Sequence, residues 1–171
     1  MREKAHAIIT VGVSGSGKTT VGEVLAKRLG WSFIDGDAFH LPSSVEKMRA
    51  GTPLTDDDRW PWLKAIAAEI ARRRAAADRV VIACSALKRA YRDVLVDGHS
   101  DVLLVHMKGS RELIMSRLAP RQGHYFPAAL LESQFATLEE PDATENALTV
   151  IVDRDVDALV DEIVRALSQA T

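Results

Sequence analysis

The fold of this 171-residue chain is decided by Gly12-Val13-Ser14-Gly15-Ser16-Gly17-Lys18-Thr19. This stretch fits the pattern G-x-x-x-x-G-K-[ST] at every position. An apolar, β-branched run at residues 7–11 precedes it, and a helical pattern at residues 18–29 follows it. Glycines between a buried strand and a helix N-terminus let backbone N–H groups turn inward toward phosphate oxygens. The stretch therefore predicts a phosphate-binding loop.

The parts of this loop have separate expected contacts with ATP and Mg²⁺. Lys18 should reach the β- and γ-phosphates and act in catalysis, and the Thr19 hydroxyl should ligate the metal. A dinucleotide-binding loop is disfavoured, because its third glycine would fall where the chain has Thr20. With the more distant Arg117, the expected nucleotide-binding residues are Gly12, Val13, Ser14, Gly15, Ser16, Gly17, Lys18, Thr19 and Thr20.

The rest of the chain alternates between short apolar runs and helical periodicity. Helices are expected at 18–29, at 62–71 with Pro61 near the start, and along a stripe from Val156 to Leu167. This alternation predicts an α/β fold of the P-loop NTPase, nucleoside-monophosphate-kinase-like class, with helices on both faces of a parallel sheet. We expect one domain over residues 1–171, with five strands at 7–11, 32–35, 80–84, 102–107 and 147–152.

Composition excludes several classes of function. A net charge of −2 gives no basic excess for nucleic acid, and no apolar run is long enough to span a membrane. The single cysteine, Cys84, excludes a disulfide framework and a cysteine-built zinc site. We therefore expect a cytoplasmic protein without nucleic-acid or membrane partners. The acidic segment 139–145 is expected to be an exposed connection.

The class of P-loop protein can be narrowed further. No lysine lies in an N/T-K-x-D guanine signature, and the third strand ends Ile82-Ala83-Cys84-Ser85 without the acidic pair of motor ATPases. A small-molecule kinase is the best remaining class. A nucleotide sensor without transfer activity is the alternative, and such a sensor would need no acceptor-side carboxylate.

Two carboxylates follow the second strand, where an open α/β sheet places its ligand crevice. We assign Asp37 to the acceptor hydroxyl, as the group that orients it and takes its proton, and Asp35 to a water on Mg²⁺. The glycine between them permits a close approach, and His40 follows shortly after. The alternative is a solvated Asp-Gly turn.

Basic residues suggest that the acceptor is an anion. Arg59 follows three aspartates, and Lys88 and Arg92 are spaced to share a helix face. The alternative is a solvated basic face paired with Asp93 or Asp97, and the sequence leaves open which cation would hold a carboxylate. A short lid is expected at about 117–127, carrying Arg117, the candidate catalytic Arg121 and the candidate substrate ligand His124.

Taken together, these residues resemble the P-loop gluconate kinases (gluconokinases). The matching segments, in order over about residues 8–141, are Gly12–Thr19, Asp35–Asp37, His40, Lys47-Met48, Gly51–Leu54, Asp56–Arg59, Pro61–Leu63, Cys84–Lys88, Tyr91–Asp93, Arg121–His124 and Ser133–Phe135. The chain departs from the usual family pattern at Ser44, Val96 and Tyr125.

The resemblance implies ATP-dependent phosphorylation of the 6-hydroxyl of D-gluconate, with Mg²⁺, in a homodimer. It implies a substrate-binding helical segment at about 38–60. The nearest alternative is shikimate kinase, which lacks the Cys84–Lys88 segment; other small-molecule P-loop kinases are further alternatives. The expected substrate-binding residues are Asp37, His40, Lys47, Arg59, Lys88, Arg92, His124 and Gln134.

Overall fold

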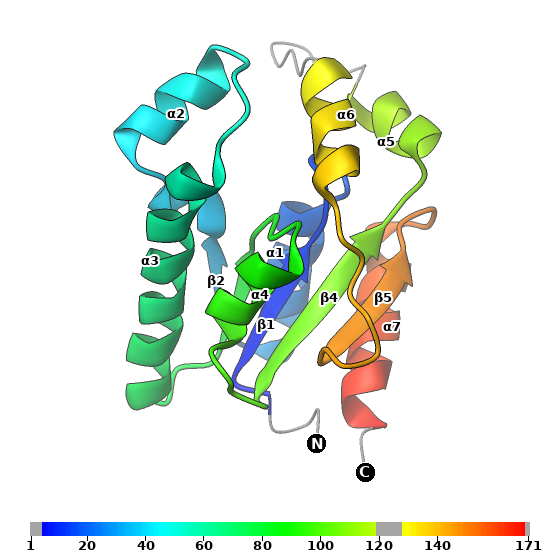
Figure 1. The fold of residues 1–171 in the computed structure, drawn as a ribbon. Helices are drawn as coiled ribbons and strands as arrows, with labels where there is room; N and C mark the ends of the chain where they lie inside the picture. The colour runs from blue at the N-terminus through cyan, green and yellow to red at the C-terminus, as the bar shows by residue number, and fades with distance from the viewer. Residues whose placement is uncertain (1–4, 119–127, 170–171) are drawn as a thin grey trace.

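A computed structural model describes residues 5–118 and 128–169, and its centre is a parallel sheet (Figure 1). The strand order is β2-β3-β1-β4-β5, and every neighbouring pair is parallel. The predicted five-stranded α/β fold is confirmed, with strand ends shifted by no more than one residue. The strands are β1 (Ala7–Val11), β2 (Ser32–Asp35), β3 (Val80–Ala83), β4 (Val102–Lys108) and β5 (Ala147–Ile151).

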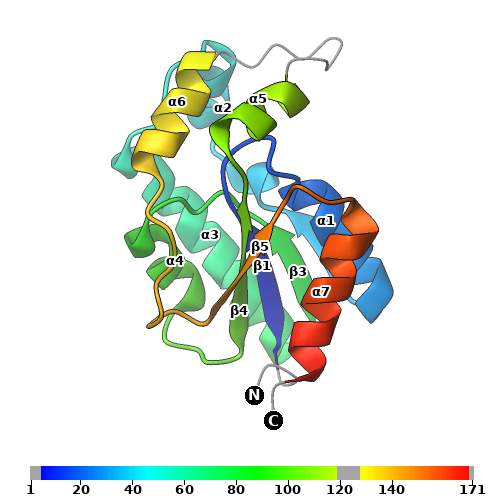
Figure 2. The same ribbon diagram turned by 90° about the vertical axis from the view of Figure 1, so that its right-hand side faces the viewer.

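Helices cover both faces of the sheet, as Figure 2 shows with α1 and α7 on one side and α3 and α4 on the other. Alternate strand residues point to opposite faces, so Ile8 packs with α1 and α7 while Ile9 packs with α3 and α4. This explains why the inner strands are apolar at consecutive positions. The helices are α1 (Lys18–Leu29), the 3₁₀-helix η2 (Gly36–Phe39), α2 (Pro42–Arg49), α3 (Asp56–Ala75), α4 (Arg89–Val96), α5 (Arg111–Leu118), α6 (Ala128–Thr137) and α7 (Val156–Ser168).

Helix α3 corrects the predicted start of the helix at 62–71. It begins at Asp56, where the Thr55 side chain accepts from the Asp58 amide at 3.2 Å and the Asp58 carboxylate accepts from the Thr55 amide at 2.8 Å. This capping box outweighs Pro61, which lies inside the helix. Because proline has no backbone N–H, the helix loses one hydrogen bond, the one that residue 61 would donate to the carbonyl of Asp57, and it continues past that point.

The loops that follow β1, β2 and β3 meet at the carboxyl edge of the sheet, and α2 and α6 rise above that edge (Figure 1). Gly36 fixes how closely η2 approaches β3, because a Cβ there would lie 2.5 Å from the carbonyl oxygen of Ala83. The indole N–H of Trp62 donates to the Gly36 carbonyl at 2.8 Å. The glycine therefore permits a close approach to β3, as predicted, but Asp35 and Asp37 do not lie along one extended strand, because Asp35 ends β2 and Asp37 lies in η2. No helix within the described ranges is long and apolar enough to cross a membrane.

Candidate active site

The predicted phosphate loop joins β1 to α1 in the conformation that its glycines require. Gly15 and Gly17 have φ values of 81° and 94°, in the left-handed region. A Cβ on Gly12 would lie 2.9 Å from the carbonyl oxygen of Met107. The amide of Gly12 donates to the carbonyl of Ser85 at 3.2 Å, which ties the loop to the segment after β3.

Groups in this loop fit an anionic phosphate chain. The Lys18 ammonium donates to the carbonyl of Val13 at 2.9 Å, and burial lowers its pKa while nearby Asp37 opposes that shift. The Ser16 hydroxyl is buried without a hydrogen-bond partner among the described residues. A half-buried cation, a buried hydroxyl without a partner and a helix N-terminus together fit the phosphates of ATP.

The two expected metal-site residues suit Mg²⁺ rather than a metal held by a protein cage. Thr19 lies exposed in the first turn of α1, and an Asp35 oxygen accepts from the Asp37 amide at 3.0 Å. Within residues 5–118 and 128–169, no three His, Cys, Asp or Glu side chains are grouped to hold a metal ion. The hydroxyl of Thr19 and the carboxylate of Asp35 are oxygen ligands of the kind that Mg²⁺ takes together with water and substrate phosphates.

Beside the phosphate loop lies a pocket of about 290 Å³, which we call the acceptor pocket. It collects residues from the phosphate loop, η2, α2 and the loop after it, α3, the β3–α4 segment and α6. This volume fits a small organic acceptor. The lining residues are Ser14, Lys18, Asp37, His40, Met48, Thr52, Pro53, Leu54, Arg59, Trp62, Ser85, Leu87, Tyr91, Leu130, Ser133 and Gln134.

Asp37 brings a carboxylate into this pocket opposite Lys18. Its side chain is 76% exposed, yet desolvation by the surrounding pocket wall raises its pKa, and the Asp35 charge raises it further. His40 Nε2 lies 3.7 Å from an Asp37 oxygen, and the His40 ring stacks on Trp62 with centroids 4.1 Å apart. Burial lowers the pKa of His40, which favours the neutral imidazole.

Within residues 5–118 and 128–169, Arg59 is the arginine that lines the acceptor pocket. It donates to the Tyr91 hydroxyl at 3.1 Å and lies 3.7 Å from an Asp56 oxygen. The Tyr91 hydroxyl donates to Asp56 in turn, and burial followed by that hydrogen bond raises the pKa of Tyr91 to about 12. This network holds Arg59 against one wall of the pocket while its cation remains near the cavity.

Lys47 and Lys88, two of the expected substrate ligands, lie beside aspartates in the first turn of α3 and do not line the pocket. Lys47 binds Asp58 at 2.8 Å, and this hydrogen bond is the main cause that lowers the pKa of Asp58 to about 2. The Lys88 ammonium lies 3.5 Å from Asp56 and 5.7 Å from the centroid of the Tyr91 ring. Lys88 is also the N-cap of α4, so it and Arg92 do not share a face within one helix as the spacing suggested.

Arg92 requires a correction. Its side chain is 1% exposed and pairs with Glu145, whose side chain is 5% exposed, so it does not face the acceptor pocket. The exposed connection predicted at 139–145 is confirmed for most of its residues, while the side chain of Glu145 turns inward to Arg92. The partner of Arg92 is therefore Glu145, and neither Asp93 nor Asp97 as in the alternative of a solvated basic face.

Of the other predicted site residues that the structure describes, Gln134 lines the pocket and Arg117 does not. Gln134 lines the pocket and binds the phosphate loop: its Oε1 accepts from the Ser14 amide at 2.7 Å, and its Nε2 donates to the Ser14 hydroxyl at 3.0 Å. Arg117 donates to the carbonyl of Val152, away from the loop backbone. Arg121 and His124 lie outside the described residues.

Sequence reasoning missed part of the pocket wall. Trp62 is the first residue of the helix expected at 62–71 and is not among the predicted site residues, yet its ring stacks on His40 and it lines the pocket. Ser85 follows the third strand, and the rule that strand carboxyl ends face the ligand crevice was sufficient to find it. Leu130 and Ser133 come from α6, whose position above the sheet has no signal in local sequence.

Comparison with known proteins matches this geometry to a family. A family model described as an AAA domain matches residues 8–141. A gluconokinase of Gluconobacter oxydans is 44% identical, with 95% of this chain and 91% of the relative covered. The chain belongs to the gluconokinase family.

Solved structures agree with this family assignment. A gluconokinase from Sinorhizobium meliloti is 42% identical, with a TM-score of 0.89 over 99% of this chain and 94% of that one. A shikimate kinase from Aquifex aeolicus covers 95% of this chain and 96% of its own, at 19% identity and a TM-score of 0.57, which shows the shared fold alone. Gluconokinases are therefore favoured over the shikimate kinase alternative.

Proposed function

We propose that this protein is a gluconokinase, which transfers the γ-phosphoryl group of ATP to the 6-hydroxyl of D-gluconate. The products are 6-phospho-D-gluconate and ADP. One observation carries the proposal: Lys18, Asp37 and Arg59 line a single pocket beside the phosphate loop. They supply a phosphate-binding cation, a base and an anion-binding cation, which are the groups that this reaction needs.

The chemistry assigned to Asp37 is general base catalysis. Its carboxylate accepts the proton of the acceptor hydroxyl while a bond forms between that oxygen and the γ-phosphorus. The bond from the γ-phosphorus to the bridging oxygen breaks, and Lys18 stabilises the charge on the phosphoryl oxygens. Mg²⁺, with Thr19 and Asp35 as its protein-side contacts, would neutralise phosphate charge. Neutral His40 supports Asp37 from the stacked position on Trp62.

Arg59 is assigned to the carboxylate of gluconate. Arg59 lines the pocket and also lies 3.7 Å from an Asp56 oxygen, whereas the other three candidate cations, Lys47, Lys88 and Arg92, do not line the pocket. An arginine fork can bind a carboxylate through two hydrogen bonds. Gluconate would then lie with its carboxylate toward Arg59 and its far hydroxyl toward Asp37, with Gln134 near the phosphate loop.

The same proposal includes assignments that come from the sequence. These are Arg121 as a catalytic lid residue, His124 as a substrate ligand, the nucleotide contact of Arg117, and a short lid at about 117–127 on one domain. A homodimer in the cytoplasm completes it. All follow from the resemblance to gluconokinases or from the sequence pattern.

The direct test is an ADP-release assay with ATP and a panel of acceptors: gluconate, shikimate, other sugar acids and nucleoside monophosphates. Gluconate should be the best acceptor, because the pocket combines a base with a carboxylate-binding cation. Turnover with shikimate but not with gluconate would overturn the proposal. ADP release that no acceptor stimulates would favour the sensor alternative.

Asp37→Asn should lower turnover at least ~100-fold while ATP binding stays nearly unchanged, because the amide cannot accept the proton. In the wild type, activity should fall as pH decreases through the pKa of Asp37, which is raised above that of an ordinary aspartate. Asp97→Asn is the matched control, since Asp97 lies at the far end of α4 in a left-handed conformation that asparagine also adopts. Unchanged turnover in Asp37→Asn would refute the assigned role.

Arg59→Lys should raise the KM for gluconate about 10- to 100-fold, the loss expected for one charge-assisted, bidentate contact. The ATP affinity should stay within about threefold, because the phosphates bind elsewhere. Arg28→Lys is the control, as its guanidinium pairs with Asp161 between α1 and α7. If Arg59→Lys kept the wild-type KM, another residue would hold the carboxylate.

A further inference from the structure

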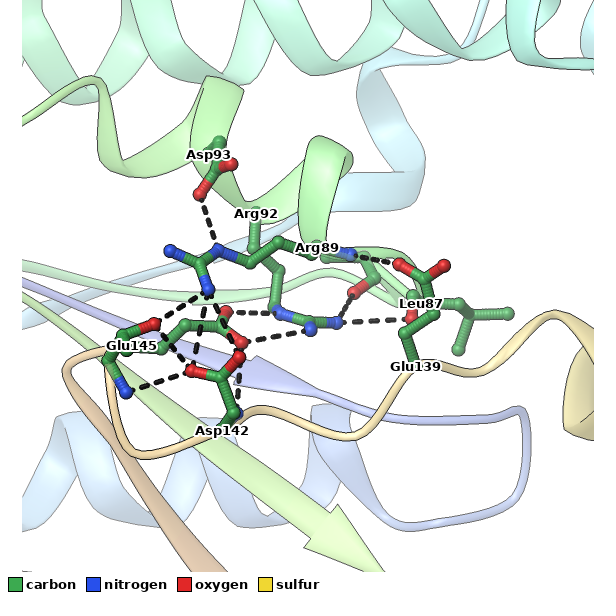
Figure 3. Close-up of polar contacts among 9 residues, drawn as sticks. Leu87, Arg89, Arg92, Asp93, Glu139, Asp142 and Glu145 are labelled. Carbon is green, nitrogen blue, oxygen red and sulfur yellow. Dashed lines mark hydrogen bonds and ion pairs between the residues drawn. The ribbon is translucent and has the colours of Figure 1, made fainter.

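The buried pair of Arg92 and Glu145 joins two parts of the chain that border the acceptor pocket. Arg92 Nε donates to Glu145 at 2.7 Å and Nη2 donates at 3.1 Å, while Nη1 donates to the carbonyls of Ala86 and Leu87 at 3.0 and 3.1 Å. Figure 3 shows the guanidinium between the carboxylate and the Leu87 carbonyl. One side chain thus fixes both the α6–β5 connection and the loop after β3.

A second layer of contacts reinforces this attachment. The Glu139 side chain accepts from the Arg89 amide at 2.8 Å, and the Glu139 amide donates to the Leu87 carbonyl at 2.8 Å. The Arg89 guanidinium contacts both Asp93 and Asp142 (Figure 3). We call this cluster the clasp: Arg89 and Arg92 of α4 with Glu139, Asp142 and Glu145 of the α6–β5 connection.

The loop held by the clasp is strained and lies in the pocket wall. Ala86 has a φ of 38°, which is unfavourable for a residue with a Cβ, and its neighbours Ser85 and Leu87 both line the pocket. Such a conformation persists where surrounding contacts over-determine it. Arg92 supplies two of those contacts, through the carbonyls of Ala86 and Leu87.

The other end of the clasp leads into α6, which forms the facing part of the pocket. Gln134 on α6 binds Ser14 of the phosphate loop, and Gly12 of that loop binds the Ser85 carbonyl. These contacts close a ring: phosphate loop, β3–α4 loop, clasp, α6 and back to the phosphate loop. None of the clasp residues lines the acceptor pocket.

The buried ion pair of Arg92 and Glu145 contributes more to the geometry of the loop than to the stability of the fold. Taking two charges out of water costs much of what their attraction returns, so a buried ion pair is a poor stability device when apolar side chains of similar size could replace it. The pair does provide a fixed geometry, because the planar guanidinium fork serves a carboxylate and two carbonyls at once. The strained loop at Ala86 needs contacts that hold its backbone in a fixed position, and the Arg92 fork provides them.

We propose that Arg92 and Glu145 are positioning residues, which hold the β3–α4 loop and α6 at the separation that completes the acceptor pocket without touching either substrate. This proposal rests on the proposed kinase function. The pair acts through Ser85 and Leu87 on one wall and through Gln134 on the other.

Two clasp variants test this proposal. Arg92→Lys keeps a charge but loses the fork, and the double variant Arg92→Met/Glu145→Leu replaces the ion pair by apolar side chains. Arg74→Met/Asp101→Leu is the matched control, because it removes another long-range arginine–carboxylate pair, between the end of α3 and the segment before β4. Each protein is assayed for kcat, acceptor KM, binding of a non-hydrolysable ATP analogue, and amide hydrogen exchange.

Both clasp variants should fold and lose about 10- to 100-fold in kcat/KM for the acceptor, as expected for a misplaced pocket wall. Affinity for the ATP analogue should change less than about threefold. Exchange should rise in peptides covering residues 85–91 and 138–146, and the control should show neither change. Wild-type kcat and KM in both clasp variants, or unchanged exchange, would overturn the proposal.

The remaining outcomes are also decisive. If neither clasp variant folds, the pair is a stability element and the positioning role is wrong. If the wild type does not phosphorylate gluconate, the proposed function fails by itself. The clasp is then judged by hydrogen exchange and by the acceptor that the wild type does use.

Discussion

The hydrogen bond from the Gly12 amide to the Ser85 carbonyl joins the two loops on which the whole site depends. The parallel sheet makes it possible, because β1 and β3 are neighbours and end at the same edge. Gly12 can lie this close because it has no Cβ, and a Cβ at this position would collide with the Met107 carbonyl on the other side. Phosphate loop and acceptor pocket are therefore placed by backbone geometry before any substrate contact is made.

Most of the cationic side chains near the site lie beside a carboxylate of the same chain. Asp58 engages Lys47, Asp56 lies beside Lys88, and Glu145 engages Arg92. Lys18 and Arg59 line the pocket, one beside the phosphate loop and the other against Tyr91. A chain with little net charge can in this way present cations at two positions where anionic substrate groups are expected.

Much of the fold could be predicted because its signals are local. The inner strands β1, β3 and β4 are mostly apolar at consecutive positions, and the loop motif predicts the start of α1 at Lys18. The start of α3 differs from the prediction because Pro61 is typical of a first helical turn, whereas the capping box of Thr55 and Asp58 begins the helix at Asp56. Burial of Glu145 could not be read from its acidic neighbours, since its partner Arg92 is 53 residues away along the chain.

The residues of the site that lie in sequence motifs could be predicted, whereas the roles of its cations could not. Asp37, His40 and Gln134 were found from motif positions, and the structure brings all three to the pocket. Roles of the cations were not predictable, because pairing depends on which carboxylate each one meets in space. Spacing placed Lys88 and Arg92 on one helix face, whereas the structure makes one an N-cap and buries the other.

The most direct measurement is a crystal structure of the protein with gluconate, Mg²⁺ and a non-hydrolysable ATP analogue. The account predicts the 6-hydroxyl within hydrogen-bond distance of Asp37, about 2.6–3.2 Å, and the gluconate carboxylate on the Arg59 guanidinium. A gluconate bound in the opposite direction, with its carboxylate near Lys18 and its 6-hydroxyl away from Asp37, would contradict the account.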